Sequence, residues 1–480
     1  MPDTPSQPNA GSTAAEHAPA VREEISGRAD TVWTRGPGAP ALIGKSGRWT
    51  LRGSHGRVAI VDGCRTPFAK AGTDLQDMDL IDLAAAPAAE VVARTGIDPH
   101  EIERSIFGCV IPALHAPNLG REVAFRASLP MSVPGYGVSL ACASSNRAIT
   151  SGAEAILVGE CDVVLAGGAE SLSNVPIQVS KPLARRLIEL SKAKSLGQKL
   201  AIGSKIKLKH LAPVPPAIAE YTTGMTMGDA CEKMAKENDV SRRAQDEIAL
   251  LSHRRAAAAA ADGRFTGQIV AAFPPPRYDQ AVVADNGVRS DTTIEALGQL
   301  RPVFDRRYGT LTAGNSSPIT DGGAAVLLMS EEKAKALGLQ PLGYIRSWAY
   351  AALDPATQLL QGPAYAAPLA LDRAGLTLRE VDLVEMHEAF AAQIVSNLKA
   401  FASKKFAAEE LNRSAPLGEV DLERFNVTGG SIAIGHPFGA TGARITVQLL
   451  NELRRRGQNL GLMTVCAAGG VGFAMVVERA

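Results

Sequence analysis

The sequence has few aromatic residues, almost no net charge and no regular spacing of cysteines. Among its 480 residues, aromatic side chains make up 5%, and 50 basic side chains are balanced by 49 acidic ones, which gives a formal net charge of +1. So small a net charge provides no overall field for binding nucleic acid or a membrane surface. We therefore expect no nucleic-acid partner, and any basic patch must be local.

Six cysteines are scattered along the chain: Cys64, Cys109, Cys142, Cys161, Cys231 and Cys466. They form no short disulfide framework, and the N-terminus lacks a basic segment followed by an apolar one. Residues 1–55 include acids such as Glu23 and Asp30, which mitochondrial transit peptides usually lack. We expect a reduced, cytoplasmic protein in which residues 1–55, rich in small residues and proline, form a flexible extension.

The remaining composition is that of a globular protein. Hydrophobic residues make up 46% of the chain, and 46 glycines and 29 prolines indicate many tight turns. The length fits two to three domains, or one duplicated fold with an insertion. From Arg57 onward, short apolar strands such as 57–61 alternate with helical stretches, which is typical of an α/β fold.

Two regions repeat one plan of strand, turn, helix and strand. In residues 138–168, the first strand leads into Cys142 and the second meets a glycine pair. In residues 425–470, the first strand leads into a glycine-rich turn that carries His436, and the last strand reaches Cys466 before another glycine pair. Such spacing predicts an internal duplication.

Residues 457–477 contain no charged side chain and are long enough to suggest a membrane span. However, Gly461, Gly469, Gly470 and Gly472 interrupt this stretch, with apolar runs on both sides of the glycine cluster. The pattern therefore favours two buried strands joined by a tight turn.

The composition shifts in residues 173–301, where Leu183, Leu187 and Leu190 recur at helical spacing. Between residues 181 and 209, nine basic residues are opposed by Glu189 alone: Lys181, Arg185, Arg186, Lys192, Lys194, Lys199, Lys205, Lys207 and Lys209. This pattern predicts a basic amphipathic insert. The simplest interpretation is a solvated face over a core contact; the others are binding of ligand phosphates, of a partner protein or of anionic lipid head groups.

Cys142 lies at a predicted strand end, just before a helix. The positive end of the helix dipole and nearby backbone N–H groups are expected to lower its pKa, which would make it a nucleophile. A small core residue is the alternative interpretation, since most free cysteines are buried.

Three further motifs carry chemistry-bearing residues. In residues 384–390 an apolar strand delivers His387, and because Ala391 stands where a zinc protease needs a second histidine, we expect no metal. In residues 426–437, glycines that let the backbone approach a ligand precede His436. In residues 466–472, Cys466 precedes glycine-rich backbone whose N–H groups can be exposed.

Each motif has a core-filling alternative, but together the four resemble the thiolase family, and the resemblance runs from about Arg57 to the C-terminus. It also includes the segments 65–68, 167–171, 246–247, 252–253, 309–317 and 321–322. Within the family, the chain is most similar to the β-subunit of the fatty acid β-oxidation multienzyme complex, the trifunctional-type 3-ketoacyl-CoA thiolase. That narrower match lies in 192–194, 212–216 and His387.

The resemblance implies that Cys142 is the acylated nucleophile and Cys466 the acid/base. It implies that His436 activates Cys142 and, with His387, binds the thioester oxygen. The backbone N–H groups of Cys142 and Ala468 would form an oxyanion hole, and Ser317 would approach the pantetheine chain. Most thiolases have Asn in place of His387, and many have Gly in place of Ala468.

The resemblance further implies cleavage of 3-ketoacyl-CoA by CoA, with CoA as a substrate and no cofactor. The alternatives are an acetoacetyl-CoA thiolase working in the biosynthetic direction, a decarboxylating ketoacyl synthase, and a non-catalytic lipid-transfer or scaffold subunit. A second thiol, Cys466, favours thiolysis, because decarboxylation generates its own carbanion.

The expected fold is a duplicated, five-layered α-β-α-β-α core with an inserted, lid-like loop domain. The expected partners are a second copy of the chain, or more, and a subunit with hydratase and dehydrogenase activities. The expected division is a 1–55 extension, an N-terminal half at 56–172 and 302–330, an insert at 173–301 and a C-terminal half at 331–480.

Overall fold

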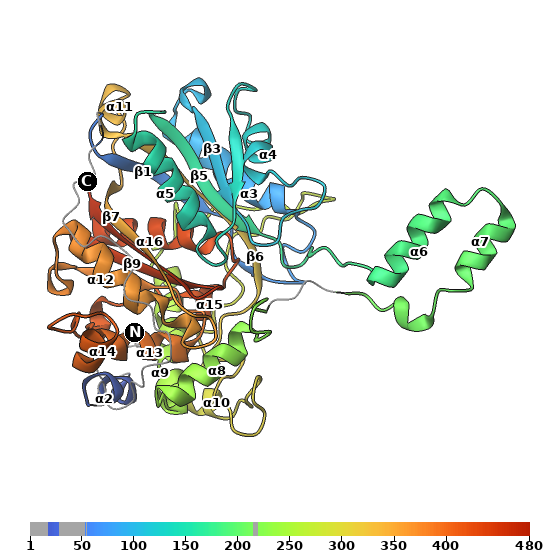
Figure 1. Cartoon of the computed structure of the whole chain (residues 1–480). Coiled ribbons are helices and arrows are strands. Elements are labelled where there is room, and N and C mark those ends of the chain that lie inside the picture. The colour runs from blue at the N-terminus through green and yellow to red at the C-terminus, as the bar shows by residue number, and fades with distance from the viewer. Residues whose placement is uncertain (1–17, 28–52, 54, 215–218) are drawn as a thin grey trace, which may run out of the picture.

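A computed structural model describes residues 18–27, 53, 55–214 and 219–480 (Figure 1). Ten strands form a mixed sheet in the order β4-β3-β5-β6-β1-β7-β10-β9-β8, with β2 beside β6. Their bounds are β1 Val58–Arg65, β2 Ala69–Lys70, β3 Arg104–Gly108, β4 Gly135–Val138, β5 Val163–Glu170, β6 Thr320–Ser330, β7 Gly343–Ala352, β8 Leu383–Met386, β9 Leu460–Ala467 and β10 Val471–Arg479.

The two halves of this sheet follow the same pattern. In the first, β3 is parallel to β5, while β5–β6 and β6–β1 are antiparallel. In the second, β8 is parallel to β9, while β9–β10 and β10–β7 are antiparallel. Within the described residues, the half-sheets are joined by two residue pairs, Ala59 with Tyr344 and Ile60 with Gly343. The predicted duplication is confirmed.

Helices form the other three layers. The helices α5 (Ser144–Leu157) and α16 (Thr441–Arg456) pack between the half-sheets, and their apolar residues belong to one core with the inner faces of both. The helices α3 (Leu80–Thr95) and α4 (Leu119–Arg126) cover the outer face of the first half-sheet, and α12 (Gly362–Ala374) covers that of the second. The expected five-layered α/β core is confirmed.

Successive side chains along a strand point to opposite faces of the sheet and so pack against different helical layers. On β5, Val164 and Ala166 face the central helices, whereas Val163 and Leu165 face α3 and α4. This period of two is the reason why a strand buried on both faces is apolar throughout.

The uncharged C-terminal stretch forms β9 and β10, joined by a turn in which Gly469 and Gly470 have positive φ angles of 81° and 69°. The interpretation as two buried strands is confirmed. None of the described helices is both long and apolar enough to cross a membrane. The expected strand at 425–427 is absent from the described residues; Phe425 makes a single bridge to Val384 on β8.

Residues 18–27 of the N-terminal extension differ from the expectation of flexibility. Residues Pro19–Gly27 form the helix α2, which packs on α9 (Arg242–Ala261) and α13 (Ala391–Ala402). Val21 and Ile25, one helical turn apart, are buried there, and the Glu247 carboxylate accepts hydrogen bonds from the N–H groups of Ala20 (2.9 Å) and Val21 (3.3 Å). A carboxylate at a helix N-terminus is stabilising. Residues 1–17, 28–52 and 54 lie outside the described residues.

The insert also differs from a single lid-like unit. The helices α6 (Lys181–Lys192) and α7 (Leu196–Gly203) form a hairpin that projects from the body (Figure 1). The helices α8 (Met227–Glu237) and α9 pack against α13 and belong to the body. The smaller helices are α10 Ile294–Gly298, α11 Glu331–Ala336, α14 Lys404–Glu409 and α15 Ser431–Ile434.

Candidate active site

Cys142 lies in a tight turn between β4 and α5. Ala141 has a φ of 46°, in the left-handed region. The Ser144 hydroxyl holds the turn, because it accepts from the Leu140 N–H (2.8 Å) and donates to the Ala141 carbonyl (2.7 Å). The backbone N–H groups of Cys142 and Ala468 lie close enough to the Cys142 sulfur to lower the pKa of the thiol, against the larger effect of burial. The turn thus presents a partly exposed thiol at the start of a helix.

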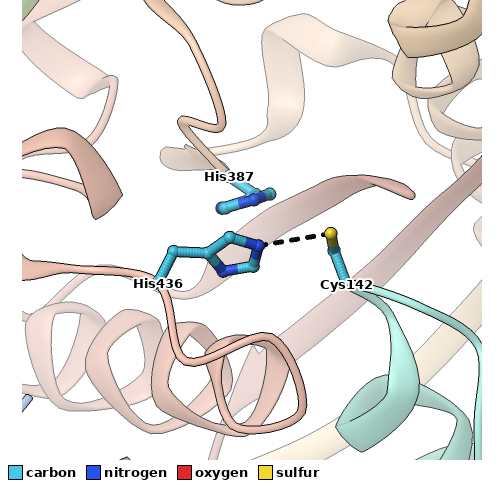
Figure 2. A group of neighbouring side chains, drawn as sticks. All are labelled: Cys142, His387 and His436. Atoms are coloured by element: carbon cyan, nitrogen blue, oxygen red, sulfur yellow. Dashed lines mark hydrogen bonds between the residues drawn. The ribbon is translucent and has the colours of Figure 1, made fainter. Parts of the chain in front are cut away.

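His436 comes from the equivalent position in the second half, before α16. Its Nε2 lies 3.2 Å from the Cys142 Sγ (Figure 2). Its Nδ1 lies 2.7 Å from the Thr441 Oγ1. The preceding Gly435 has a φ of 112°, and a Cβ there would lie 2.7 Å from the Thr320 side chain. Glycine is required at that position both for its conformation and for the close approach.

His387 follows β8 and is fully buried beside His436, with 4.0 Å between the ring centroids (Figure 2). Its Nδ1 lies 2.9 Å from the Ser431 Oγ, and its Nε2 has no partner among the described residues. A ring nitrogen of each histidine and the Cys142 sulfur all lie within 4.8 Å of one another. That spacing would also suit a soft metal ion, so the absence of a metal stays a prediction.

Two buried carboxylates fix the loops that carry the histidines. Glu388 accepts hydrogen bonds from Ser252 Oγ (2.6 Å), Asn426 Nδ2 (2.7 Å) and the Ile432 N–H (3.2 Å), which anchors the loop before α15. These donors stay bonded to Glu388, because a buried polar group without a hydrogen bond is costly.

Glu170, the second buried carboxylate, anchors loops from both halves. Its carboxylate accepts from the N–H groups of Val110 (3.0 Å) and Ile111 (2.8 Å) in the first half and of Gly439 (2.9 Å) in the second. Burial raises its pKa to about 7. The loop that carries His436 is therefore tied directly to the half that carries Cys142.

The electrostatics correct the expected ionisation of Cys142. Burial raises the pKa of this thiol to about 12, although the backbone N–H groups of Ala468 and Cys142 oppose the shift. Burial lowers the pKa of His436 to about 3 and, with the charges of His436 and Arg444, holds the pKa of His387 well below its usual value. The resting pair is a neutral thiol and a neutral imidazole, because desolvation exceeds the effect of the helix terminus.

Cys466, at the end of β9, is a second buried thiol, and burial and the neighbouring Cys142 hold its pKa well above the usual value. It lines a cavity of about 920 Å³ together with Cys142, His436, Ala468 and Ser317. His387 lies beside His436 and is not part of the cavity wall. The cavity thus unites five of the six residues predicted from the sequence.

The cavity wall also contains functional candidates that the sequence did not single out as site residues. Three of them carry cationic or imidazole side chains, namely Lys70, His253 and Arg289. His253 belongs to a segment that carries the family resemblance, whereas no local pattern marks Lys70 or Arg289. Apolar residues cover another part of the wall: Leu297, Leu300, Val303, Phe304, Leu360, Phe390, Ile432 and Phe438.

A test of the thiol–imidazole pair follows from its geometry. His436→Asn is expected to slow alkylation of Cys142 by iodoacetamide at neutral pH by about tenfold or more, because the neutral thiol loses the base that accepts its proton. In the parent protein, the alkylation rate should continue to rise above the usual titration range of cysteine, because the thiol pKa is raised. The readout is the mass of the Cys142 peptide over time.

His210→Asn, at the base of the projecting hairpin where the His210 carbonyl accepts from the Ser180 hydroxyl, is the matched control and should leave the alkylation rate unchanged. An equal alkylation rate in His436→Asn and the parent protein would show that the pair has no functional coupling.

Comparisons with known proteins agree with this geometry. The family model "Thiolase, N-terminal domain" matches residues 58–332, and "Thiolase, C-terminal domain" matches residues 339–479. The 3-ketoacyl-CoA thiolase of Yersinia enterocolitica is 52% identical over 422 residues, which cover 88% of this chain and 97% of the relative. The protein of the same name from Yersinia pestis has the same identity and coverage.

Solved structures give the same result. Human mitochondrial 3-ketoacyl-CoA thiolase in complex with CoA superposes with a TM-score of 0.75 at 31% identity, covering 91% of this chain and 100% of that one. Bacillus anthracis acetyl-CoA acetyltransferase superposes with a TM-score of 0.75 at 34% identity, covering 88% and 99%. From its matched domains, its close relatives and its fold, the chain belongs to the thiolase family.

Proposed function

We propose that the chain is a 3-ketoacyl-CoA thiolase, which cleaves 3-ketoacyl-CoA with free CoA into acetyl-CoA and a shortened acyl-CoA. The observation that carries the proposal is the Cys142–His436 pair with a second thiol, Cys466, in the wall of the same cavity. Thiolysis requires one nucleophile and one separate acid/base, and these two thiols meet that requirement.

In the first half-reaction, His436 Nε2 takes the proton of Cys142, and the sulfur attacks C3 of the substrate. The C3 oxygen becomes an alkoxide, which the N–H groups of Cys142 and Ala468 stabilise. The C2–C3 bond then breaks, and its electrons form the enolate of acetyl-CoA. Cys466 protonates C2, acetyl-CoA leaves, and Cys142 remains acylated.

In the second half-reaction, the Cys466 thiolate takes the proton of the incoming CoA thiol. The CoA sulfur attacks the acyl group, the Cys142 thiolate leaves, and it recovers its proton from His436. Every protein group returns to its starting state. Because the intermediate is a thioester like the substrate and the product, the steps lie close in energy and can run in both directions.

The cavity offers features for both parts of an acyl-CoA. Ser317 lines the cavity and is held by its N–H, which donates to the Ala389 carbonyl (3.0 Å); we assign it to the pantetheine chain. Lys70 and Arg289 provide positive charge for the CoA phosphates. The apolar wall residues suit an acyl chain, and the cavity volume lies within the usual range for small-molecule sites.

Two substitutions test the assignment of the two thiols. Cys142→Ala should give no covalent acyl adduct by mass spectrometry, because the attacking sulfur is absent. Cys466→Ser should retain alkylation at Cys142 but lower the rate of CoA-dependent thiolysis by at least ~10²-fold, the lower end of what acid/base catalysis contributes. Thiolysis is measured on 3-ketoacyl-CoA substrates of increasing chain length.

Cys231→Ser, at another buried free cysteine outside the cavity wall, is the matched control for loss of a buried thiol. Near-normal turnover of Cys466→Ser would favour the decarboxylating ketoacyl synthase. Activity confined to the shortest substrate would favour the acetoacetyl-CoA thiolase, and no CoA-dependent cleavage by the parent protein would favour a non-catalytic subunit.

We propose that the chain forms at least a homodimer. The strand β4 is an edge of the sheet, and large apolar side chains around it are exposed, including Leu114 (73%), Met131 (75%) and Tyr136 (39%). An open edge strand beside an apolar surface is a template for pairing with another chain.

The dimer is tested by light scattering during size-exclusion chromatography. Met131→Glu is expected to shift the protein toward the monomer mass, because a charge would be buried at the interface. Ile188→Glu, at an exposed apolar residue of the projecting hairpin, is the matched control. A monomeric parent protein would contradict the proposal.

We propose that the chain belongs to the trifunctional-type branch and works with a partner subunit that has hydratase and dehydrogenase activities. The residues that support this branch are His387 and the basic segment of the insert. In α6 and α7, exposed apolar side chains such as Leu187, Leu196 and Leu200 accompany the exposed lysines. Such a combination suits an anionic lipid surface.

The position of the hairpin argues against binding of the CoA phosphates. No residue between 181 and 210 belongs to the described cavity wall, and the hairpin projects from the body (Figure 1). The nine cations also exceed what the phosphates of one CoA require. We therefore favour contact with anionic lipid, with the partner subunit as the alternative.

Charge reversal tests this proposal. The double substitution Lys207→Glu and Lys209→Glu should weaken binding to anionic vesicles, most strongly at low ionic strength where screening is weak. The Michaelis constant for CoA should not change. Vesicle co-sedimentation, pull-down of the partner subunit and thiolysis kinetics are measured in parallel.

Arg379→Glu with Lys404→Glu changes the net charge equally on the body of the protein and should leave vesicle binding intact. A tenfold rise in the Michaelis constant for CoA with unchanged vesicle binding would identify the hairpin as a phosphate site. Loss of partner binding alone would identify it as a protein interface.

A further inference from the structure

The hydrogen bonds behind His436 determine which of its nitrogens carries the proton. The Thr441 hydroxyl has one proton, and it donates that proton to the Pro437 carbonyl (3.0 Å). The carbonyl can only accept, and with the hydroxyl proton directed at it the Thr441 oxygen accepts from His436 Nδ1, 2.7 Å away. A neutral imidazole protonated at Nδ1 has a free lone pair at Nε2, and this is the nitrogen that faces the Cys142 sulfur at 3.2 Å.

The hydrogen bonds behind His387 have the opposite polarity. Arg444 Nη2 donates to the Ser431 Oγ (2.8 Å), and a guanidinium has no acceptor. Among the described residues, the remaining partner of the Ser431 hydroxyl is His387 Nδ1, at 2.9 Å. The hydroxyl proton is satisfied when it points at Nδ1, and the imidazole proton then lies on Nε2, which has no partner in the described part of the chain.

We propose that Thr441 and the Arg444–Ser431 pair are positioning residues that hold the two adjacent histidines in opposite tautomers, His436 as a hydrogen-bond acceptor and His387 as a donor. The inference deepens the proposed thiolase reaction and rests on it. His436 can accept the Cys142 proton only in its Nδ1–H form, and His387 can donate to a substrate oxygen only in its Nε2–H form.

The charge of Arg444 fixes the direction of its hydrogen bond to Ser431. Arg444 is fully buried, and although burial lowers its pKa to about 10, it stays cationic at neutral pH. The carboxyl groups of Glu385 and Glu388 lie close enough to interact with this charge. Because the guanidinium can only donate, Ser431 cannot reverse its hydrogen bonds without leaving a buried group unpaired.

The two tautomers determine when each histidine can donate a hydrogen bond during the first half-reaction. His387 lies behind the cavity wall, but one of its ring nitrogens is within 4.8 Å of the Cys142 sulfur, where the substrate reacts. Before the Cys142 proton moves, His387 alone offers a donor. When His436 Nε2 has taken that proton, both histidines carry an N–H at Nε2, and two donors are available for the enolate oxygen of the acetyl-CoA fragment. When Cys142 leaves the acyl group and recovers the proton, His436 is an acceptor again. The proton that forms the nucleophile thus also completes the oxyanion site.

Two substitutions that each remove one hydroxyl separate the two tautomers. Thr441→Val should slow iodoacetamide alkylation of Cys142 about tenfold, because His436 no longer has its acceptor form fixed, and Thr441→Ser should restore the rate. Ser431→Ala should leave alkylation unchanged but lower kcat for thiolysis about tenfold or more with little change in KM, because one oxyanion donor is lost. Ser347→Ala, which removes another buried hydroxyl, bonded to the Ala370 carbonyl, is the control for both readouts.

A spectroscopic measurement keeps the test independent of activity and of folding defects. ¹⁵N NMR of the histidine-labelled parent protein should show His436 protonated at Nδ1 and His387 at Nε2, with signals assigned by their loss in His436→Asn and His387→Asn. The same tautomer on both histidines, or unchanged alkylation in Thr441→Val, would overturn the inference. Failure of the parent protein to cleave 3-ketoacyl-CoA would instead refute the proposed function, because alkylation and NMR require no substrate.

Discussion

The active site depends on the close approach of α5 and α16 between the two half-sheets. A Cβ at Gly442 would lie 2.1 Å from the Asn146 Oδ1, and the Ala443 N–H donates to the Ser145 Oγ at 3.0 Å. At this separation the turns before the two helices meet, so that a thiol from one half faces an imidazole from the other. The same packing removes most of the surface of both groups from solvent, which is why both rest uncharged and why dipoles fixed around them act strongly once charge develops.

Much of the site was predictable because its residues lie at the ends of regular elements. Cys142, His436 and Cys466 follow or precede apolar strands and helices whose repeat is visible in the sequence. The direction of the Cys142 pKa shift could not be predicted from the sequence. A helix terminus is a local feature, whereas desolvation depends on residues from distant segments. Ser431, Thr441 and Arg444 were missed for a related reason: they act through hydrogen bonds to the histidines, and no spacing marks such partners.

The fold shows the same division between local and distant information. The layers follow from strand and helix patterns that each half contains within itself. The docking of α2 does not follow from local patterns, because Val21 and Ile25 stand in a segment rich in alanine and proline. The carboxylate that holds the helix belongs to Glu247, which is distant in the sequence. The hairpin was recognised as basic and amphipathic, but amphipathic periodicity does not specify which surface an apolar face meets. Here Leu183 of that face is buried, whereas Leu187 is exposed.

The two residue pairs that join the half-sheets have a consequence for how the protein is made. During synthesis the ribosome releases the half with Cys142 before the half with His436, and the pairs of Ala59 and Ile60 with Tyr344 and Gly343 form only when the second half arrives. Until then Cys142 has no imidazole beside it and no opposing helix. In the proposed mechanism, a chain interrupted between the halves therefore retains a cysteine but cannot carry an acyl group through a turnover, so that acyl transfer begins only in finished molecules.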